Sequence, residues 1–523
     1  MSHQKMKYFI ASKSIIKLLV LLLVFSWNQV QSQGKTHNFL IGYQNAAGTW
    51  TTHGKGRLLL NSNSIVVIGE NRKMPFQETQ ANISDENGNL LISTNGCWIA
   101  DATGDTMMNG SGLSPNAFTN DYCNLVPIGL PIMYGNIILP YPNILDKYIL
   151  FHQTGNYNAN AVSTEIYYSE IDLSLNGGLG AVTSKNQIIL NDNLVWGLAA
   201  CKHANGRDWW IVALRDASTI IHKFLLDSSG ITYMGIQNLG FPAPVTWGNA
   251  TQPTFSPDGT KFVYGSGRGG GISTAFHDVR LFNFDRCTGN FTGLAYIALN
   301  DSSTGFGLAF SPDSKYLYNS SFQRIYQFNT DTSDIAASKT IVAVNDGYYS
   351  PVPPYQSDFW LMYLAANGKI YISSGNSVID LHYINFPDST GMACDVHLHD
   401  LHLPCFNVGS VPNHPNYYLG CDTTQTSCPC LTTGINEINQ HDFRFSISPN
   451  PNNGNFRIMY LLPQNKSGTL QIFDITGKEI YHQNLPPWST LQYISLPKIA
   501  DGVYQCTITS NNQRVNKKLV VVE

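Results

Sequence analysis

The sequence predicts an all-β protein in which a β-propeller is followed by a small immunoglobulin-like β-sandwich. A hairpin motif that recurs at a near-constant interval, and the short strands of alternating polarity between its copies, predict the propeller. A separate unit rich in short strands at the end of the chain predicts the sandwich. Stretches with the period of a long helix are absent from the sequence.

The hairpin motif is clearest in two stretches, FSPDGTKFVYGS at 255–266 and FSPDSKYLYNSS at 310–321. In each stretch, Pro and Asp supply turn chemistry between two strands, and Gly259 can take the positive φ that other residues resist. With four looser copies included, the turn positions are Gly88, Lys147, Gly206, Gly259, Ser314 and Gly368. They lie 53 to 59 residues apart, and such a period filled by short strands is typical of a four-stranded blade.

Seven blades are expected, and six are the alternative. The region at 37–421 is almost seven periods long, and strands at 38–43, 57–61 and 65–68 precede the first hairpin. In either arrangement the first and last strands of this region would share a blade, which would close the ring and remove an open sheet edge. The repetition therefore indicates architecture rather than chemistry.

Composition narrows the class of protein. A chain of 523 residues is too long for one ordinary core, but a propeller avoids this limit because each blade packs only against its neighbours. Charged residues make up 13% of the chain, against about 25% in a typical soluble protein. The net charge is −4, so the chain lacks the basic surface that binds nucleic acids or anionic membranes, and we expect no nucleic-acid partner.

Residues 1–32 are predicted to be a signal peptide. Lysines precede an apolar run at 15–27, and Val30, Gln31 and Ser32 form a cleavage site that ends at Ser32. The alternative is a retained membrane anchor, but the run is shorter than the roughly 20 apolar residues of a spanning helix. The mature chain is therefore expected to have no transmembrane helix.

Three further segments follow. The propeller is assigned to residues 33–421, a polar linker without periodicity to 422–441, and the β-sandwich to 442–523. The seven short strands expected in the sandwich lie at 443–447, 456–461, 470–474, 478–482, 492–496, 503–508 and 517–522.

The tail resembles the type A C-terminal sorting domain of the Bacteroidetes type IX secretion system. The matching residues are Pro449, Asn450, Pro451, Gly454, Phe456, Asp474, Gly477, Lys478, Gly502, Val503, Tyr504, Lys517, Lys518, Leu519, Val520 and Val521. The resemblance implies that the type IX machinery exports the chain through this domain, and that the cargo is secreted or attached to the outer cell surface. In that family the tail is usually removed.

The region at 37–421 resembles a group of secreted Bacteroidetes proteins with TolB-like or related propeller repeats. The stretches that carry this resemblance are ANISDENGNLL at 81–91, SLNGGLG at 174–180, KHANG at 202–206, the two FSPD stretches, and PNHPNYYLG at 412–420. The ligands of that group are mostly unassigned. The resemblance therefore implies a location and a fold, and no particular activity.

The chain has ten cysteines, and an exported protein can join them in disulfides. Cys97 and Cys123 flank one excursion between blades and form a candidate pair. Cys201 and Cys506 lie inside apolar strands and are expected to be unpaired. Five cysteines cluster after the last hairpin, which indicates a disulfide-linked closure or linker. They are Cys394, Cys405, Cys421, Cys428 and Cys430.

Candidate metal ligands are His397, His399 and His402, together with Asp395. In a strand, His397 and His399 would point to one face at a separation that suits zinc. A solvent-facing loop of non-ligand histidines is the favoured interpretation, so no metal and no cofactor are expected.

Two loops resemble ligand sites in part. The loop at 85–89 has oxygen ligands at alternate positions, but Leu90 stands where a calcium loop needs Gly. The loop at 268–271 lacks the ending and the helix of a phosphate-binding loop. We interpret the first as a hairpin turn and the second as a connection between strands.

Residues that could serve hydrolysis or stacking are scattered along the chain. The carboxylates and histidines are Glu70, Glu78, Asp85, Glu165, Asp208, Asp216, Asp278, His53, His152, His203 and His277. Tryptophan side chains could stack on sugars or bind a protein, but they also pack between blades. The tryptophans are Trp50, Trp98, Trp196, Trp209, Trp210, Trp247 and Trp360. No nucleophile elbow or zinc-protease signature is present.

The sequence favours a binding module that meets a glycan or a protein on one face of the ring. The alternative is a secreted hydrolase or lyase with its site at the mouth of the central channel, and a third is a stable spacer in a surface layer. Carboxylates or histidines gathered from three or more blades would favour the enzyme. An aromatic or Asn-rich face without such a group would favour binding.

Overall fold

The computed structural model describes residues 34–43, 54–61, 64–124, 128–156, 162–241, 252–268, 276–299, 305–351, 354–424, 427–430, 445–460, 462, 466–486, 491–496, 499–510 and 513–522. The expected signal peptide lies outside these residues. Strands dominate the described part, whose one α-helix is α2 (Ala117–Asn124). Within the same residues, no helix has the length and apolar character needed to cross a membrane.

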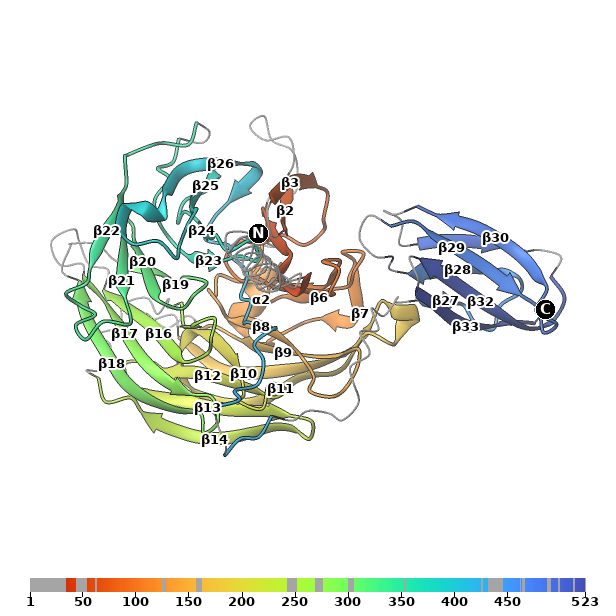
Figure 1. Ribbon diagram of the computed structural model, residues 1–523, viewed down its shortest axis with the longest axis horizontal. Helices are drawn as coiled ribbons and strands as arrows, with labels where there is room; N and C mark the ends of the chain where they lie inside the picture. Colours follow the sequence, from red (N-terminus) through yellow and green to blue (C-terminus); the bar gives the residue numbers. More distant parts are fainter. Residues whose placement is uncertain are drawn as a thin grey trace, which may run out of the picture.

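The strands between residues 38 and 407 form sheets arranged around a common centre (Figure 1). The first sheet is antiparallel and places Phe39 opposite Leu58. Its three strands are β1 (Asn38–Ile41), β2 (Lys55–Asn61) and β3 (Ser64–Glu70).

The second sheet has eleven strands and contains three successive meanders. The first meander is β4 (Ala81–Ser84), β5 (Leu90–Thr94), β6 (Trp98–Ala100) and β7 (Thr106–Ser111). The second is β8 (Asn136–Pro140), β9 (Lys147–Gln153), β10 (Ser163–Asp172) and the first part of β11 (Ala181–Lys202). The third is the last part of β11 with β12 (Trp209–Arg215), β13 (Ile220–Asp227) and β14 (Gly230–Asn238).

Three separate four-stranded sheets follow. The first contains β15 (Thr254–Phe255), β16 (Lys261–Arg268), β17 (Phe276–Asp285) and β18 (Asn290–Leu299). The second contains β19 (Gly305–Phe310), β20 (Tyr316–Ser321), β21 (Arg324–Asn329) and β22 (Thr340–Val344). The third contains β23 (Met362–Leu364), β24 (Ile370–Ile372), β25 (Val378–Ile384) and β26 (Val396–Asn407).

The first strand of each group lines the centre of the ring. Contacts run in succession from β1 to β4, β8, β11, β15, β19 and β23. The circuit closes where the ring of Phe39 on β1 meets the ring of Tyr363 on β23, with their centroids 5.5 Å apart. A closed circuit of antiparallel meanders is a β-propeller, which confirms the predicted fold.

The grouping of strands favours seven blades over six, if the long β11 is divided between two blades. The number of blades stays a prediction, because the first sheet has three strands where a complete blade has four. Each layer between neighbouring sheets has its own apolar cluster. In one of them Trp210 of β12 meets Phe284 of β17 edge to face, at 6.5 Å between centroids.

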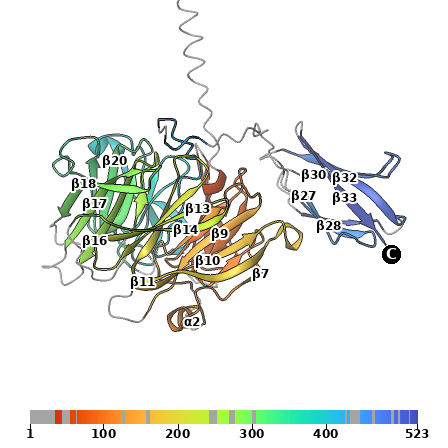
Figure 2. The same cartoon turned by 90° about the horizontal axis from the view of Figure 1, so that it is seen from below.

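Residues 409–422, which we call the strap, follow the last strand of the ring. Among the described residues after 407, none adds a strand to the first sheet, so the expected sharing of one blade by the two ends of this region does not occur there. The strap instead returns across the ring. Figure 2 places the strap, in blue, and α2 on opposite sides of the ring.

The C-terminal unit is a β-sandwich with the predicted seven strands, in a three-stranded and a four-stranded sheet. Its core includes Phe456, Ile472 and Leu519. The strands are β27 (Phe445–Ser448), β28 (Asn455–Tyr460), β29 (Gly468–Phe473), β30 (Glu479–Leu485), β31 (Leu491–Ser495), β32 (Gly502–Ser510) and β33 (Gln513–Val521).

Candidate functional site

The three candidate metal ligands lie on β26 and do not converge. The His397 ring lies between the carboxylates of Asp395 and Asp400, with each N–O distance at 3.1 Å. It also stacks on the ring of Tyr383, at 4.5 Å between centroids. Its two nitrogens therefore already face carboxylate oxygens.

The other two histidines have separate carboxylate partners. His399 Nε2 lies 2.9 Å from Asp346 Oδ2, and His402 Nδ1 lies 2.6 Å from Asp380 Oδ1. The backbone φ of His399 is 39°, and the pairing of β26 with β25 shifts register beside it. This irregularity breaks the alternation on which a shared face depends. In the described part of the chain no group of three or more His, Cys, Asp or Glu residues could hold a metal ion.

The loop at 85–89 is a hairpin turn. Asp85 Oδ1 accepts hydrogen bonds from the backbone N–H groups of Asn87 and Asn89, both at 2.9 Å. Gly88 takes a φ of 82°. The loop at 269–271 and the candidates His53, Trp50 and Trp247 lie outside the described residues.

Most of the scattered carboxylates and histidines have partners that explain them. Glu70 pairs with Arg57 and Arg72. The buried His152 lies between the hydroxyls of Ser114 and Ser169, at 2.6 and 3.0 Å. Further pairs are Asp208 with Arg207, Asp278 with Arg280, His203 with the carbonyl of Cys287, His277 with Asn319, and Glu165 with the hydroxyl of Thr164.

Glu78 differs from these candidates. It precedes β4, and no described residue forms a hydrogen bond or ion pair with its carboxylate, although the side chain is partly buried. Burial alone raises the pKa of Glu78 to about 7, because it disfavours the charged form. A carboxyl group with a perturbed pKa and no structural partner is a candidate functional group.

Trp360 and Gly409 lie beside Glu78. A Cβ atom placed on Gly409 would lie 3.2 Å from Glu78 Cγ and 3.4 Å from Trp360 Nε1. A Cβ atom on Gly375 would lie 3.2 Å from Cε3 on the same indole. Two glycines thus allow the backbone to approach the Trp360 ring closely, and Phe322 packs against that ring at 4.9 Å between centroids.

A second carboxylate, Asp358, lies two residues before Trp360 and, unlike Glu78, accepts hydrogen bonds from neighbouring residues. Its Oδ1 accepts hydrogen bonds from Ser374 Oγ and the N–H of Gly375, each at 2.7 Å. Burial raises the pKa of Asp358, and these hydrogen bonds oppose that rise. Asp358 therefore has a structural role in fixing the loop that carries Trp360.

Further oxygen atoms lie on the segments beside Glu78. The side-chain oxygens of Gln80, Asn407 and Ser410 are buried and have no hydrogen-bond partner among the described residues. The backbone N–H of Asn413 donates to the carbonyl of Gln80 at 3.4 Å. We call Glu78, Gln80, Trp360, Asn407, Gly409 and Ser410 the Glu78 cluster.

The strap fills the centre of the ring next to this cluster. Asn413 Nδ2 donates to the carbonyl oxygens of Tyr134, Asn136 and Leu198, at 3.2, 3.1 and 3.0 Å. His414 lies between the hydroxyl of Tyr363, at 2.7 Å, and a carbonyl oxygen. The strap therefore closes the centre from the side of the hairpin turns.

Several of the recurring hairpin turns meet the strap. The Tyr418 hydroxyl donates to Glu86 Oε2 at 2.7 Å, and Asn416 Nδ2 donates to the carbonyl of Pro257 at 2.7 Å. A Cβ atom on Gly206 would lie 2.6 Å from the backbone nitrogen of Cys421. Because these turns follow the first strands whereas Glu78 and Trp360 precede them, the turns and the cluster lie at opposite ends of those strands.

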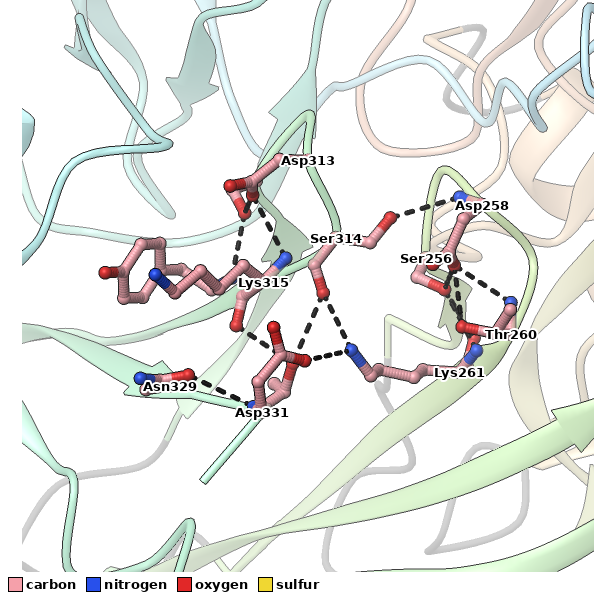
Figure 3. Close-up of polar contacts among 12 residues, drawn as sticks. Ser256, Asp258, Thr260, Lys261, Asp313, Ser314, Lys315, Asn329 and Asp331 are labelled. Atoms are coloured by element: carbon pink, nitrogen blue, oxygen red, sulfur yellow. Dashed lines mark hydrogen bonds and ion pairs between the residues drawn. The ribbon is translucent and has the colours of Figure 1, made fainter. Parts of the chain in front are cut away.

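The two FSPD turns also touch each other (Figure 3). The backbone N–H of Asp258 donates to Ser314 Oγ at 3.1 Å. Lys261 Nζ donates to the Ser314 carbonyl at 3.1 Å and lies 2.9 Å from Asp331 Oδ1. The motif therefore links neighbouring sheets, and its Asp residues cap turns rather than face a ligand.

The other described tryptophans pack inside the protein. Trp209 and Trp210 are 1% and 2% exposed. Trp98 and Trp196 border an apolar cluster around the Cys97–Cys123 disulfide.

Two more disulfides, Cys287–Cys428 and Cys421–Cys430, tie the beginning of the expected linker to the ring. Cys394 and Cys405 carry free thiols. The free, buried thiols of Cys201 and Cys506 confirm the expectation for both.

The sorting-motif residues at the beginning of the sandwich meet those at its end. The Asn450 side chain bonds the backbone of Lys518 and Val520, both at 2.7 Å, and thereby joins the first motif to the last strand. In the middle motif, Asp474 Oδ1 accepts the N–H of Lys478 at 3.0 Å and Gly477 takes a φ of 83°. The Tyr504 hydroxyl, from the motif residues 502–504, donates to the carbonyl of Ala500 at 2.7 Å.

Sequence reasoning named Glu78 and Trp360 without joining them, and it missed Asn407, Ser410 and the role of the strap. The stretch PNHPNYYLG could have indicated the strap. It has two Asn residues and a His but no strand alternation, which is typical of a connection held by side-chain hydrogen bonds. Its position inside the ring could not be read from local pattern.

A search of curated proteins found no match to the chain. Among solved structures, a functionally unknown protein from Desulfotomaculum acetoxidans is 15% identical, with 69% of this chain and 96% of that chain covered and a TM-score of 0.39. A protein from Lactobacillus plantarum is 13% identical, with coverages of 72% and 98% and a TM-score of 0.39. A quinonprotein alcohol dehydrogenase-like protein from Bacteroides thetaiotaomicron is 11% identical, with coverages of 72% and 77% and a TM-score of 0.36.

The family comparison concerns the tail. Residues 446–522 match the secretion system C-terminal sorting domain. The match confirms the resemblance drawn from the motifs and implies the type IX machinery as a partner. The chain therefore carries a type IX sorting domain, which indicates secretion and attachment to the cell surface.

Proposed function

We propose that the ring is a binding module displayed at the cell surface and that it meets a glycan or a protein ligand through the Glu78 cluster. The observation that carries this proposal is a partly buried carboxylate that forms no hydrogen bond or ion pair with any described residue, beside Trp360 and Gly409. Buried polar groups in folded proteins almost always have partners. A bound ligand would supply the missing one.

The rival function is a secreted hydrolase or lyase. A pKa near 7 would suit Glu78 as a general acid. Glycoside hydrolysis uses a second carboxylate across the reacting bond, and the nearby Asp358 already accepts hydrogen bonds from Ser374, Gly375 and Asn376. Binding needs only the Glu78 carboxylate and its neighbours, so we favour it over an enzyme that needs a second, converging carboxylate.

The test is a binding screen with the chain from residue 33 to residue 523, against glycan arrays and extracted surface proteins, beside a panel of chromogenic hydrolase substrates. The variant Glu78→Gln keeps the size of the side chain and removes its charge. Ligand binding that Glu78→Gln weakens, without turnover of any substrate, supports the proposal. Turnover that Glu78→Gln abolishes would establish the enzyme instead.

A further inference from the structure

We propose that the Glu78 cluster binds the positively charged end of a lysine or arginine side chain presented by a polypeptide partner. This inference rests on the proposed binding function and names the chemistry of its ligand. Three observations carry it: the cluster atoms without hydrogen-bond partners among the described residues are oxygens, several protein donors beside them are engaged, and an indole ring borders the same glycine as the carboxylate.

Within the cluster, the atoms without partners among the described residues are all oxygens. They are the Glu78 carboxylate and the side-chain oxygens of Gln80, Asn407 and Ser410. Of these, only the Ser410 hydroxyl can also donate. Gln80, Asn407 and Ser410 are each at most 1% exposed, so leaving such oxygens without donors costs about 1–3 kcal/mol for each group.

The segments that carry these oxygens adjoin one another. Gly409 lies between the Glu78 side chain and the Trp360 indole. Asn407 Nδ2 donates to the carbonyl of Ser410 at 3.3 Å, which folds this turn on itself. The backbone bond from Asn413 to Gln80 then holds the strap against the segment that carries Glu78.

Several donors of the protein near the cluster have other acceptors, although the buried Asn82 Nδ2 on β4 has none among the described residues. The N–H of Gly409 donates to the Ser374 carbonyl at 2.8 Å. The Asn413 amide serves three carbonyls. Arg72 donates to the carbonyls of Met74 and Ile41, both at 2.8 Å. The Glu78 carboxylate, which is the part of the cluster that is not fully buried, is therefore left to accept from donors that a ligand brings.

A basic side chain fits this demand better than a sugar or a metal ion. Lysine and arginine heads carry only donors and a positive charge, whereas each sugar hydroxyl adds an acceptor with its donor. An indole attracts an organic cation through its π face but offers no ligand to Ca²⁺, which takes a shell of oxygens. Trp360, whose Nε1 and Cδ1 atoms border Gly409, is therefore compatible with an organic cation and supplies no ligand to a metal ion.

The experiment uses the chain from residue 33 to residue 523 and measures binding by titration calorimetry at pH 8. The probes are the capped tripeptides Gly-Arg-Gly and Gly-Lys-Gly, the uncharged Gly-Gln-Gly, N-acetylglucosamine, and CaCl₂. The variants are Glu78→Gln and Trp360→Leu. The matched control is Glu170→Gln, which removes a carboxylate from β10, outside the cluster. Thermal unfolding verifies that each variant is folded.

We expect a basic tripeptide to bind and the uncharged one to fail. Glu78→Gln should weaken binding about tenfold or more, since it removes the charge partner. Trp360→Leu should weaken binding about threefold, and Glu170→Gln should leave it unchanged. At pH 6 the wild-type affinity should fall, because protonation neutralises Glu78.

Other outcomes overturn the inference and separate it from the proposed function. A Glu78-dependent signal from N-acetylglucosamine or CaCl₂ would replace the basic side chain as ligand and leave a binding protein. Binding of basic tripeptides that all three variants retain would move the site elsewhere. No binding by any probe would reject the inference, and turnover in the substrate panel would reject the proposed function as well.

Discussion

Burial shifts the pKa of Glu78 and that of His152 in opposite directions, because it favours the neutral form of each side chain. Glu78 is neutral when protonated, so its pKa rises to about 7. His152 is neutral when deprotonated, so its pKa falls to about 3. Both residues therefore link the stability of the ring to pH, with opposite signs.

Glu78→Gln should stabilise the unliganded protein at pH 8 and leave it unchanged at pH 4. The folded state holds the Glu78 proton up to about pH 7, whereas the unfolded chain releases it near pH 4.5. The stability that this group contributes is therefore present below pH 4.5 and is lost as pH rises through about 7. We expect a gain of about 1–3 kcal/mol in the free energy of unfolding at pH 8, measured by denaturant titration. An equal gain at both pH values would show that the charge is not responsible.

His152→Gln should flatten the acid side of the stability curve. Between pH 6.5 and about 3 the unfolded chain binds a proton at this histidine and the folded chain does not, so stability falls as pH decreases. One such group contributes a slope of about 1.4 kcal/mol per pH unit. The slope of unfolding free energy against pH, measured from pH 4 to 6, should decrease by this amount in the variant. An unchanged slope would contradict the neutral, buried state.

The recurring hairpin turn is the element on which the ring depends. Gly88, Gly206, Gly259 and Gly368 take φ values from 73° to 82°. In the remaining copies Ser314, at φ 63°, and Asp146, at φ 59°, adopt this conformation. The turn thus needs one residue with a positive φ. In several copies this residue also lies against the strap or a neighbouring sheet.

Gly259→Ala should destabilise the ring more than Gly112→Ala. Both glycines have a positive φ, at 73° and 72°, so an alanine at either site meets a similar backbone penalty of about 1 kcal/mol. At Gly259 the added Cβ would also lie 2.7 Å from Leu419 Cδ2 and 2.9 Å from Cys201 Sγ, whereas nothing lies within 4 Å at Gly112. We expect about 1–3 kcal/mol more at Gly259 from the added crowding, measured by chemical unfolding. Equal losses of unfolding free energy in the two variants would show that the side chains around Gly259 move aside without a measurable cost.

At the scale of the whole molecule, packing between the first and last sheets closes the ring, and two disulfides fasten the segment that follows it. Cys287–Cys428 joins residues 141 positions apart, whereas Cys421–Cys430 joins residues 9 apart. Both hold the chain just before the sorting domain. The tail that carries the address therefore follows a segment that is covalently tied to the ring.

Replacing Cys287 and Cys428 by Ser should cost more stability than replacing Cys421 and Cys430 by Ser. A longer closed loop removes more conformational entropy from the unfolded chain, so the losses should be about 5 and 3 kcal/mol in the chain-entropy estimate. Thermal unfolding of the two double variants under non-reducing conditions measures the order. A larger loss for the short loop would mean that local strain outweighs loop entropy.

The alternation, the turn residues and the constant interval were enough to predict the propeller, and the seven sandwich strands and the sorting motif were also found in advance. These features are local, because turn chemistry and strand period act over a few residues. The Cys97–Cys123 disulfide needed only proximity across one excursion. The loop interpretation of His397, His399 and His402 was wrong, because these residues lie on β26, whose register shift is not visible in the spacing of the residues.

The Glu78 cluster could not be assembled in the same way. Glu78, Trp360 and Gly409 are separated by long stretches of chain and meet because the circuit of first strands closes and the strap returns through its centre. Local pattern thus determined which strands form, how often they recur and where the chain is sent. Packing between distant segments decides which polar atoms are buried without a hydrogen-bond partner. The tertiary structure of the closed ring therefore determined the Glu78 cluster, and the sequence pattern did not.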